Sequence, residues 1–463
     1  GQEIIKATTG LTVIFGNVGL DWKRINEDGR PRKYNAAFVA QDGKVLTGEA
    51  GYPFIIKNAL PNYREFDDKR YFQALSWLCA EKKLAINKIL QPVDIKFEGK
   101  TLPVGIFLCE DGWTENYSVN VPSILAKNGA QLLVNLSCSP YTLGKNGRRH
   151  LVFGQQAKSL HLPLVYCNNV GLQNNGKNIY TYDGCSCIYG TEGQVLAAAP
   201  LFEECLLRFR YDFTSGDMTA MDNSMPSLFE EQTLFAGDPR PRAKKGRKAK
   251  KTLSLLTGTL TKNQAPSLET VEADIQAEHA GDPRAEVEHI YQAVKYGTRK
   301  FLQQCGIKKM VIGLSGGIDS AVTAALYTDI LGPRNVLLVN MPSKFNSGTT
   351  KGLARQIATN LGANYTIISI QDSVEHTVSQ LTGTPIHSYL LNRDFKLELS
   401  GLMKENIQAR DRGARLLAAL ASAFGGGFSC NSNKAEITVG YATFYGDICG
   451  LVAPLGDLWK HQV

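Results

Sequence analysis

Met310-Val-Ile-Gly-Leu-Ser-Gly-Gly-Ile-Asp-Ser-Ala-Val322 is the stretch that decides the fold of the second half of this 463-residue chain. Its apolar start predicts a buried strand, and the residues after Ser320 carry the apolar spacing of a helix. Between them lies a glycine turn, where the missing Cβ atoms let backbone N–H groups close on a ligand. Because the first turn of a helix adds partial positive charge, the stretch predicts a phosphate-binding site.

The turn carries an acid, Asp319, at the place where the Walker phosphate loop carries a lysine. An acid beside bound phosphate is explained if it binds Mg²⁺, which bridges phosphate oxygens. The alternative is an ordinary strand–helix turn in which Asp319 only caps the helix. Ser315 to Ser320 resembles the pyrophosphate loop of the N-type ATP pyrophosphatases, which split ATP into an adenylated intermediate and pyrophosphate. The resemblance implies that ATP is bound by Gly313, Leu314, Ser315, Gly316, Gly317, Ile318, Asp319 and Ser320.

The residues that follow the loop extend this pattern. Apolar runs at Val336–Met341 and Tyr365–Ile370 predict two more strands, with a helix between them at residues 351–361. An amphipathic helix is expected at residues 285–304, ahead of the first strand. Strands that alternate with helices predict a doubly wound parallel sheet, with its ligand site at the carboxyl ends of the strands.

The first half of the chain predicts a second layered α/β domain, with short buried strands at residues 104–108, 132–134 and 164–166. Cys109 directly follows the first of these strands, where α/β domains place reactive groups. A thiol becomes a nucleophile as the thiolate, which requires a nearby cation or base, and Lys57 is the candidate. The alternatives are a buried structural cysteine and a solvated surface lysine.

Several stretches of this domain resemble the nitrilase-type glutaminase domain, in the order in which that family has them. They are Tyr34-Asn-Ala-Ala37, Lys57, Leu60-Pro-Asn-Tyr63, Phe66-Asp67, Cys109-Glu-Asp-Gly-Trp113, and Ser139-Pro-Tyr141 with Lys145. The resemblance implies an α-β-β-α sandwich in which Cys109 attacks the glutamine carboxamide and releases ammonia. It further implies that Lys57 stabilises the oxyanion, that Glu65 is a second catalytic acid, and that glutamine is held by Tyr63, Ser139 and Lys145.

The general base of the nitrilase-type glutaminases is a glutamate on an earlier strand. Glu49 precedes a Gly-Tyr pair similar to the one that follows that base, but it stands in the wrong place relative to Lys57. Either the glutaminase lacks its base, or the base and its strand precede Gly1 in a longer protein. We expect the second, because a domain without its first strand would expose a sheet edge.

Further motifs in the second domain resemble NAD⁺ synthetase, and both domains together resemble its glutamine-dependent form. The resemblance implies binding of deamido-NAD by Asn406, Glu436 and Lys460, and an ATP contact at Asn431. It also implies Asp319 and Glu436 as Mg²⁺ ligands, and a homo-oligomer. The family usually has Thr-Gly where Asn431-Ser432 stand and Ser where Ala435 stands, and it extends beyond Val463 into a further substrate-binding segment.

These motifs predict a glutaminase domain at 1–217, a linker at 218–284 and a synthetase domain at 285–463. The net charge of +8, from 51 Lys and Arg against 43 Asp and Glu, is local, because the run Arg240–Lys251 holds eight basic residues and no acid. A nucleic-acid-binding surface across the fold is therefore not expected. Ten cysteines without paired spacing predict reduced thiols in a cytoplasm, and no apolar run reaches the length of a membrane span.

The predicted reaction is the ATP-dependent amidation of deamido-NAD to NAD⁺ with ammonia from glutamine. Three alternatives stay open at this point. The loop alone also fits an amidotransferase of the GMP or asparagine synthetase type. The first domain alone fits a nitrilase-type amidase with a degenerate partner domain. The basic run fits a nucleic-acid-binding scaffold, whose binding would be sensitive to salt.

Overall fold

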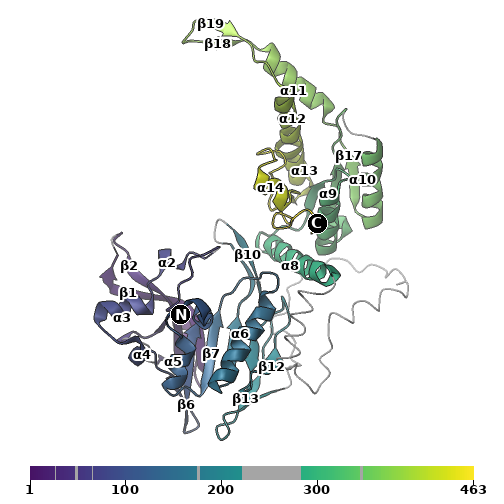
Figure 1. The fold of residues 1–463 in the computed structure, drawn as a ribbon. Coiled ribbons are helices and arrows are strands. Elements are labelled where there is room, and N and C mark those ends of the chain that lie inside the picture. Colours follow the sequence, from purple (N-terminus) through teal and green to yellow (C-terminus); the bar gives the residue numbers. More distant parts are fainter. Residues whose placement is uncertain (27, 47–50, 65, 175–177, 222–282, 345–347) are drawn as a thin grey trace, which may run out of the picture. The chain divides into compact units, whose positions relative to one another are not determined.

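The computed structural model describes residues 1–26, 28–46, 51–64, 66–174, 178–221, 283–344 and 348–463. The basic run Arg240–Lys251, Glu49 and Glu65 lie outside these residues. The chain divides into two compact units, and the second unit contains Ile290–Val463 (Figure 1). None of the described helices combines the length and the hydrophobicity needed to span a bilayer.

The first domain is built on two sheets. The smaller sheet pairs β1 (Thr12–Ile25), β2 (Pro31–Gln41) and β3 (Lys44–Val45) in that order, with β4 (Ile55–Ile56) also pairing with β2. The larger sheet has the order β12 (Val195–Ala198), β11 (Cys187–Tyr189), β8 (Leu164–Asn168), β7 (Leu132–Ser137), β6 (Lys100–Leu108), β5 (Val93–Phe97). Its central strands β6, β7 and β8 run parallel, and the outer strands are antiparallel.

Side chains alternate between the two faces of each strand, and one face of each sheet packs against the other sheet. Ala37 and Val39 of β2 pack with Ile106 and Val134 of the larger sheet, so these side chains form the layer between the two sheets. Their neighbours in sequence point the other way, as the period of two requires, and pack in a second cluster with residues of the helices. The layers are therefore helix, sheet, sheet and helix. The α-β-β-α sandwich that the sequence predicted is confirmed.

The remaining elements of the first domain are helices and two hairpins. The helices are α1 (Gln2–Lys6), α2 (Asp68–Tyr71), α3 (Leu75–Lys82), α4 (Ile86–Ile89), η2 (Cys109–Gly112), η3 (Thr114–Asn116), α5 (Val121–Lys127) and α6 (Lys145–Leu160). The hairpins are β9 (Val170–Asn174) with β10 (Ile179–Asp183), and β13 (Phe209–Tyr211) with β14 (Met218–Ala220). Because β14 pairs with β13, residues 218–220, which the sequence analysis assigned to the linker, form a strand of this hairpin.

The second domain has a parallel sheet of order β17 (Asn364–Ile367), β16 (Val336–Asn340), β15 (Met310–Gly313), β20 (Gly427–Phe428). Met310 and Ile312 pack with residues of α8, α9 and α10 on one face. Val311 points to the other face and packs against Leu417 and Ala421. Helices therefore cover both faces, and the predicted doubly wound sheet is confirmed.

The other elements of the second domain lie before, between and after the strands of this sheet along the chain. They are α8 (Pro283–Gln304), α9 (Ile318–Leu331), η4 (Pro333–Asn335), α10 (Gly348–Leu361), α11 (Gln371–Gly383), α12 (Gly401–Arg410), a π-helical turn η5 (Asp411–Leu417), α13 (Ala418–Phe424) and α14 (Lys434–Val439). The hairpin of β18 (Ile386–Ser388) and β19 (Arg393–Phe395) stands away from the sheet beyond α11 (Figure 1).

His150, on α6, gives the first domain a pH-dependent stability. Burial, with a smaller contribution from Arg149, lowers the pKa of His150 from 6.5 to about 4. The unfolded chain therefore binds a proton before the folded chain does as the pH falls, and the free energy of unfolding decreases between pH 6.5 and about 4.

We expect urea titrations followed by tryptophan fluorescence to show this decrease, because Trp22, Trp77 and Trp113 belong to the first domain. In His150→Gln the stability should vary less over the same pH range than in the wild type. An identical pH dependence in the two proteins would contradict this account.

Candidate functional sites

Cys109 stands at a sharp turn where β6 ends. Its φ is +44°, in the left-handed region that costs a non-glycine residue roughly 1–2 kcal/mol, so the surrounding fold must hold it there. The turn η2 starts at this residue and directs the chain away from the sheet. At Gly112 a Cβ atom would lie 2.5 Å from the ring of Phe153, so the turn packs closely against α6.

Lys57 is buried beside this turn, at 4% exposure. Its Nζ donates to Asp68 Oδ2 at 2.6 Å. Burial alone would lower the pKa of Lys57, but the charges of Cys109, Asp68 and Asp111 outweigh it and raise the pKa above its ordinary value. The side chain therefore remains an ammonium ion and provides a permanent positive charge in the neighbourhood of the thiol.

Asp68 is a site residue that the sequence analysis missed. That analysis assigned the second acid to Glu65, whose position lies outside the described residues. The sequence does show a group of acids here, since Asp67 and Asp68 follow Glu65 closely. Their spacing alone does not show which of these acids contacts Lys57. The ion pair between Asp68 and Lys57 identifies the acid that contacts the lysine in this structure.

Cys109 opens into a cavity of about 690 Å³ whose lining also contains Tyr63, Ser139 and Lys145. The structure thus brings the predicted nucleophile together with the three predicted glutamine residues. Glu110 also lines the cavity and was not predicted. Its Oε1 accepts hydrogen bonds from the hydroxyls of Tyr63 at 3.0 Å and Tyr117 at 2.9 Å, which fix the carboxylate in place.

A buried polar network holds the backbone of Ser139. Its N–H donates to Asn168 Oδ1 at 2.9 Å, and its carbonyl accepts from Arg149 Nη2 at 3.2 Å. Arg149 in turn pairs with Asp183 through two hydrogen bonds of 2.5 and 3.0 Å, and both side chains are almost fully buried. The wall of the cavity is therefore fixed by paired polar groups, and not by apolar packing alone.

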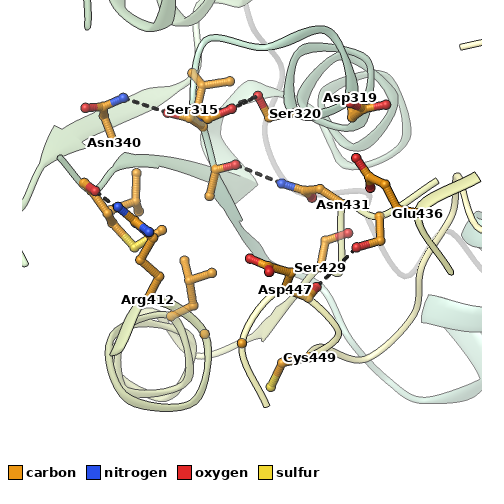
Figure 2. A pocket seen from close by; sticks show the side chains of 18 of the residues that line it. Ser315, Asp319, Ser320, Asn340, Arg412, Ser429, Asn431, Glu436, Asp447 and Cys449 are labelled. Atoms are coloured by element: carbon orange, nitrogen blue, oxygen red, sulfur yellow. Dashed lines mark hydrogen bonds between the residues drawn. The ribbon is translucent and has the colours of Figure 1, made fainter. Parts of the chain in front are cut away.

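The glycine turn of the second domain borders another cavity, of about 480 Å³ (Figure 2). The Ser320 hydroxyl donates to the Gly317 carbonyl at 2.9 Å, and the Ser315 hydroxyl accepts from the Gly317 N–H at 3.2 Å. These bonds close the turn around the start of α9, with Gly317 as its N-cap. Of the predicted ATP residues, the cavity lining contains Gly313, Leu314, Ser315, Asp319, Ser320 and Asn431.

Asp319 and Glu436 line the same side of this cavity (Figure 2). Asn433 links them, because its Nδ2 donates to Asp319 Oδ1 at 3.1 Å and its backbone N–H donates to Glu436 Oε2 at 3.2 Å. Lys460 donates to Asp319 Oδ2, so this carboxylate forms an ion pair with a lysine. The sequence analysis identified both acids but missed Asn433.

The two asparagines predicted to contact the substrates lie in different places, one in the cavity lining and one outside it. Asn431 donates to the Gly313 carbonyl at 2.8 Å, which ties its segment to β15. Asn406 lies outside the cavity lining and its Oδ1 accepts from the Thr443 hydroxyl at 2.7 Å. Two charged residues that the sequence analysis assigned no role, Arg412 and Asp447, do line the cavity.

Two carboxylates are a small donor set for a metal ion. Within the described parts of the chain, no group of three or more His, Cys, Asp or Glu side chains is placed to hold one. Mg²⁺ is commonly bound by one or two carboxylates together with phosphate oxygens of the substrate. Asp319 and Glu436 fit that mode of binding.

Comparison with known proteins divides the chain in the same way as the structure. A family model for carbon-nitrogen hydrolases matches residues 6–213, and a family model for NAD synthases matches residues 290–463.

Full-length relatives match across both domains. The chain is 29% identical to the glutamine-dependent NAD(+) synthetase of a Synechocystis strain over 99% of its own length, which spans 66% of that relative. It is 32% identical to the Aquifex aeolicus glutamine-dependent NAD(+) synthetase over all of its length and 69% of the relative. A solved structure of the Acinetobacter baumannii glutamine-dependent NAD+ synthetase, in complex with ADP, is 28% identical, with a TM-score of 0.69 over 99% of this chain and 67% of that one.

Proposed function

This chain belongs to the family of glutamine-dependent NAD(+) synthetases, and from that premise we propose that it amidates deamido-NAD to NAD⁺ with nitrogen from glutamine. The observation that carries the proposal is the presence of two complementary sites in one chain. One is a half-buried thiol that lines a cavity, at a strained turn beside a buried lysine. The other is a pyrophosphate-type loop that borders a second cavity, within the size range of small-molecule sites.

In the first domain, the Cys109 thiolate attacks the carboxamide carbon of glutamine. The Lys57 ammonium stabilises the negative charge that develops on the carbonyl oxygen, a contribution typically worth a few kcal/mol in a site that excludes water. Ammonia leaves, and water hydrolyses the resulting thioester to glutamate. Glu110 and Lys145, of opposite charge in one cavity, complement the α-ammonium and α-carboxylate groups of an amino acid.

In the second domain, a carboxylate oxygen of deamido-NAD attacks the α-phosphorus of ATP, and pyrophosphate leaves. The N–H groups at the start of α9 and the Lys460 ammonium bind the phosphate oxygens on which charge accumulates. Ammonia then attacks the activated carbonyl carbon and displaces AMP. Mg²⁺, held by Asp319 and Glu436 when bound, would neutralise phosphate charge.

The assignment of substrates to single residues is part of the proposal. ATP is assigned to the run Gly313–Ser320 and to Asn431, and deamido-NAD to Asn406, Glu436 and Lys460. The family-model boundaries support domains at 1–217 and 285–463, the first extended by β14. A homo-oligomer and a cytoplasmic location complete the proposal.

Release of AMP separates this function from its rivals. The purified protein, with ATP, Mg²⁺ and glutamine, should release AMP when deamido-NAD is added, and not when xanthosine monophosphate or aspartate is added. AMP release with either of the latter alone would point to an amidotransferase of the GMP or asparagine type. Glutamine hydrolysis without any AMP release would point to an amidase.

A further inference from the structure

Asp111 lies two residues after Cys109 and is buried, at 4% exposure. Its Oδ1 accepts hydrogen bonds from the backbone N–H groups of Asn58, at 3.1 Å, and Ala59, at 2.6 Å. Its Oδ2 accepts from the backbone N–H of Leu108, at 3.3 Å. One carboxylate therefore binds backbone groups from two separate chain segments.

Those segments carry the two reacting side chains of the proposed glutaminase site. Asn58 and Ala59 directly follow Lys57, and Leu108 directly precedes Cys109. We propose that Asp111 is a positioning residue of this site, which fixes the segment of Lys57 against the turn of Cys109. The inference rests on the proposed glutaminase function, since it assigns Asp111 to the geometry of that reaction.

The chemistry of the contact requires a carboxylate. Three N–H donors converge on the side chain, and an ionised carboxylate is a group that only accepts hydrogen bonds. An asparagine of the same shape would turn its own NH₂ group toward at least one of these donors. Burial raises the pKa of Asp111 to about 6, although the three N–H donors and the Lys57 ammonium lower it, so the carboxylate is mainly ionised at neutral pH.

The strained backbone at Cys109 explains why hydrogen bonds to Asp111 are needed to hold the turn. A cysteine with a φ of +44° relaxes to ordinary backbone angles unless neighbouring contacts hold it. The bond from Leu108 fixes the residue that directly precedes the turn, and the bonds from Asn58 and Ala59 fix the two residues after Lys57 against the same carboxylate. A displacement of about 1 Å between reacting groups can cost roughly 100-fold in rate.

The test is Asp111→Asn, with Asp21→Asn as a matched control. Asp21 is a comparably buried carboxylate of the same domain, at 7% exposure, and accepts from the Tyr52 hydroxyl and the Lys23 N–H. For Asp111→Asn we expect kcat for glutamine hydrolysis to fall about 100-fold with KM for glutamine nearly unchanged. Alkylation of Cys109 by iodoacetamide, followed by peptide mass spectrometry, should slow, while ammonia-dependent synthesis should match the wild type.

Asp21→Asn should keep the wild-type kcat and alkylation rate even if its thermal midpoint falls. If Asp111→Asn does not fold, Asp111→Glu, which moves the carboxylate by one methylene, carries the same prediction of lower kcat and slower alkylation. A wild-type kcat in the folded variant, or an equal loss in Asp21→Asn, would overturn the inference. A wild-type protein that hydrolyses no glutamine would instead refute the proposed glutaminase function.

Discussion

Cys109→Ala should abolish glutamine-dependent NAD⁺ synthesis while ammonia-dependent synthesis continues. The variant removes the only atom assigned to attack the carboxamide, and loss of a catalytic nucleophile costs roughly 10⁴-fold or more in rate. The second domain carries its own cavity and its own core, so activation of deamido-NAD does not depend on this thiol. The measurement is NAD⁺ formation with glutamine or with ammonium chloride as the nitrogen source.

Cys167→Ala is the control for the loss of a thiol from the same domain. Cys167 lies on β8, is exposed, and is not part of the cavity lining among the described residues. It should keep both activities. Retained glutamine use in Cys109→Ala, or loss of both activities, would contradict the division of labour between the domains.

Asp319→Asn should strongly reduce synthesis with both nitrogen sources. The substitution keeps the shape of the side chain but removes a negative charge that faces the cavity, together with its ion pair to Lys460. If Asp319 binds Mg²⁺, the rate of AMP formation should fall roughly 10²–10³-fold, by analogy with the loss of one preorganised electrostatic contact. The concentration of Mg²⁺ required for half-maximal activity should also rise. Glutamine hydrolysis at Cys109 should persist.

A matched control is Asp372→Asn. Asp372 is likewise an acid in the first turn of a helix, α11, in the same domain, but it is exposed and does not line the cavity. It should retain wild-type synthesis. An Asp319→Asn variant that forms AMP at the wild-type rate and at the same Mg²⁺ concentration would exclude Asp319 as a metal ligand.

The sequence predicted what local pattern determines. Continuous apolar runs at β6 and β15 indicated buried strands, and the glycine turn between Gly313 and Ser320 marked the start of a helix. The 16-residue helix α6 was not predicted, because its polar residues dilute the apolar spacing.

The site was predictable to the extent that its residues stand in motifs. Cys109 was identified as a candidate by its place after a predicted strand, and Lys57 as a possible cation for its thiolate. Tyr63, Ser139 and Lys145 were found only through the resemblance to a family. The partners that hold them are separated by long stretches of chain: Arg149 is 34 residues from Asp183, and Asp111 is 52 from Ala59. A pattern in one sequence carries no information on such contacts, because they depend on which strand ends meet in the folded sheet.

Transfer of nitrogen between the two sites is the central claim, and isotope labelling measures it directly. The wild-type protein is incubated with glutamine labelled with ¹⁵N at the amide, deamido-NAD, ATP and Mg²⁺, in the presence of unlabelled ammonium, and the NAD⁺ is analysed by mass spectrometry. We expect NAD⁺ that carries the label in its carboxamide, and unlabelled NAD⁺ from Cys109→Ala. NAD⁺ without label from the wild-type protein, or no NAD⁺ at all, would contradict the account.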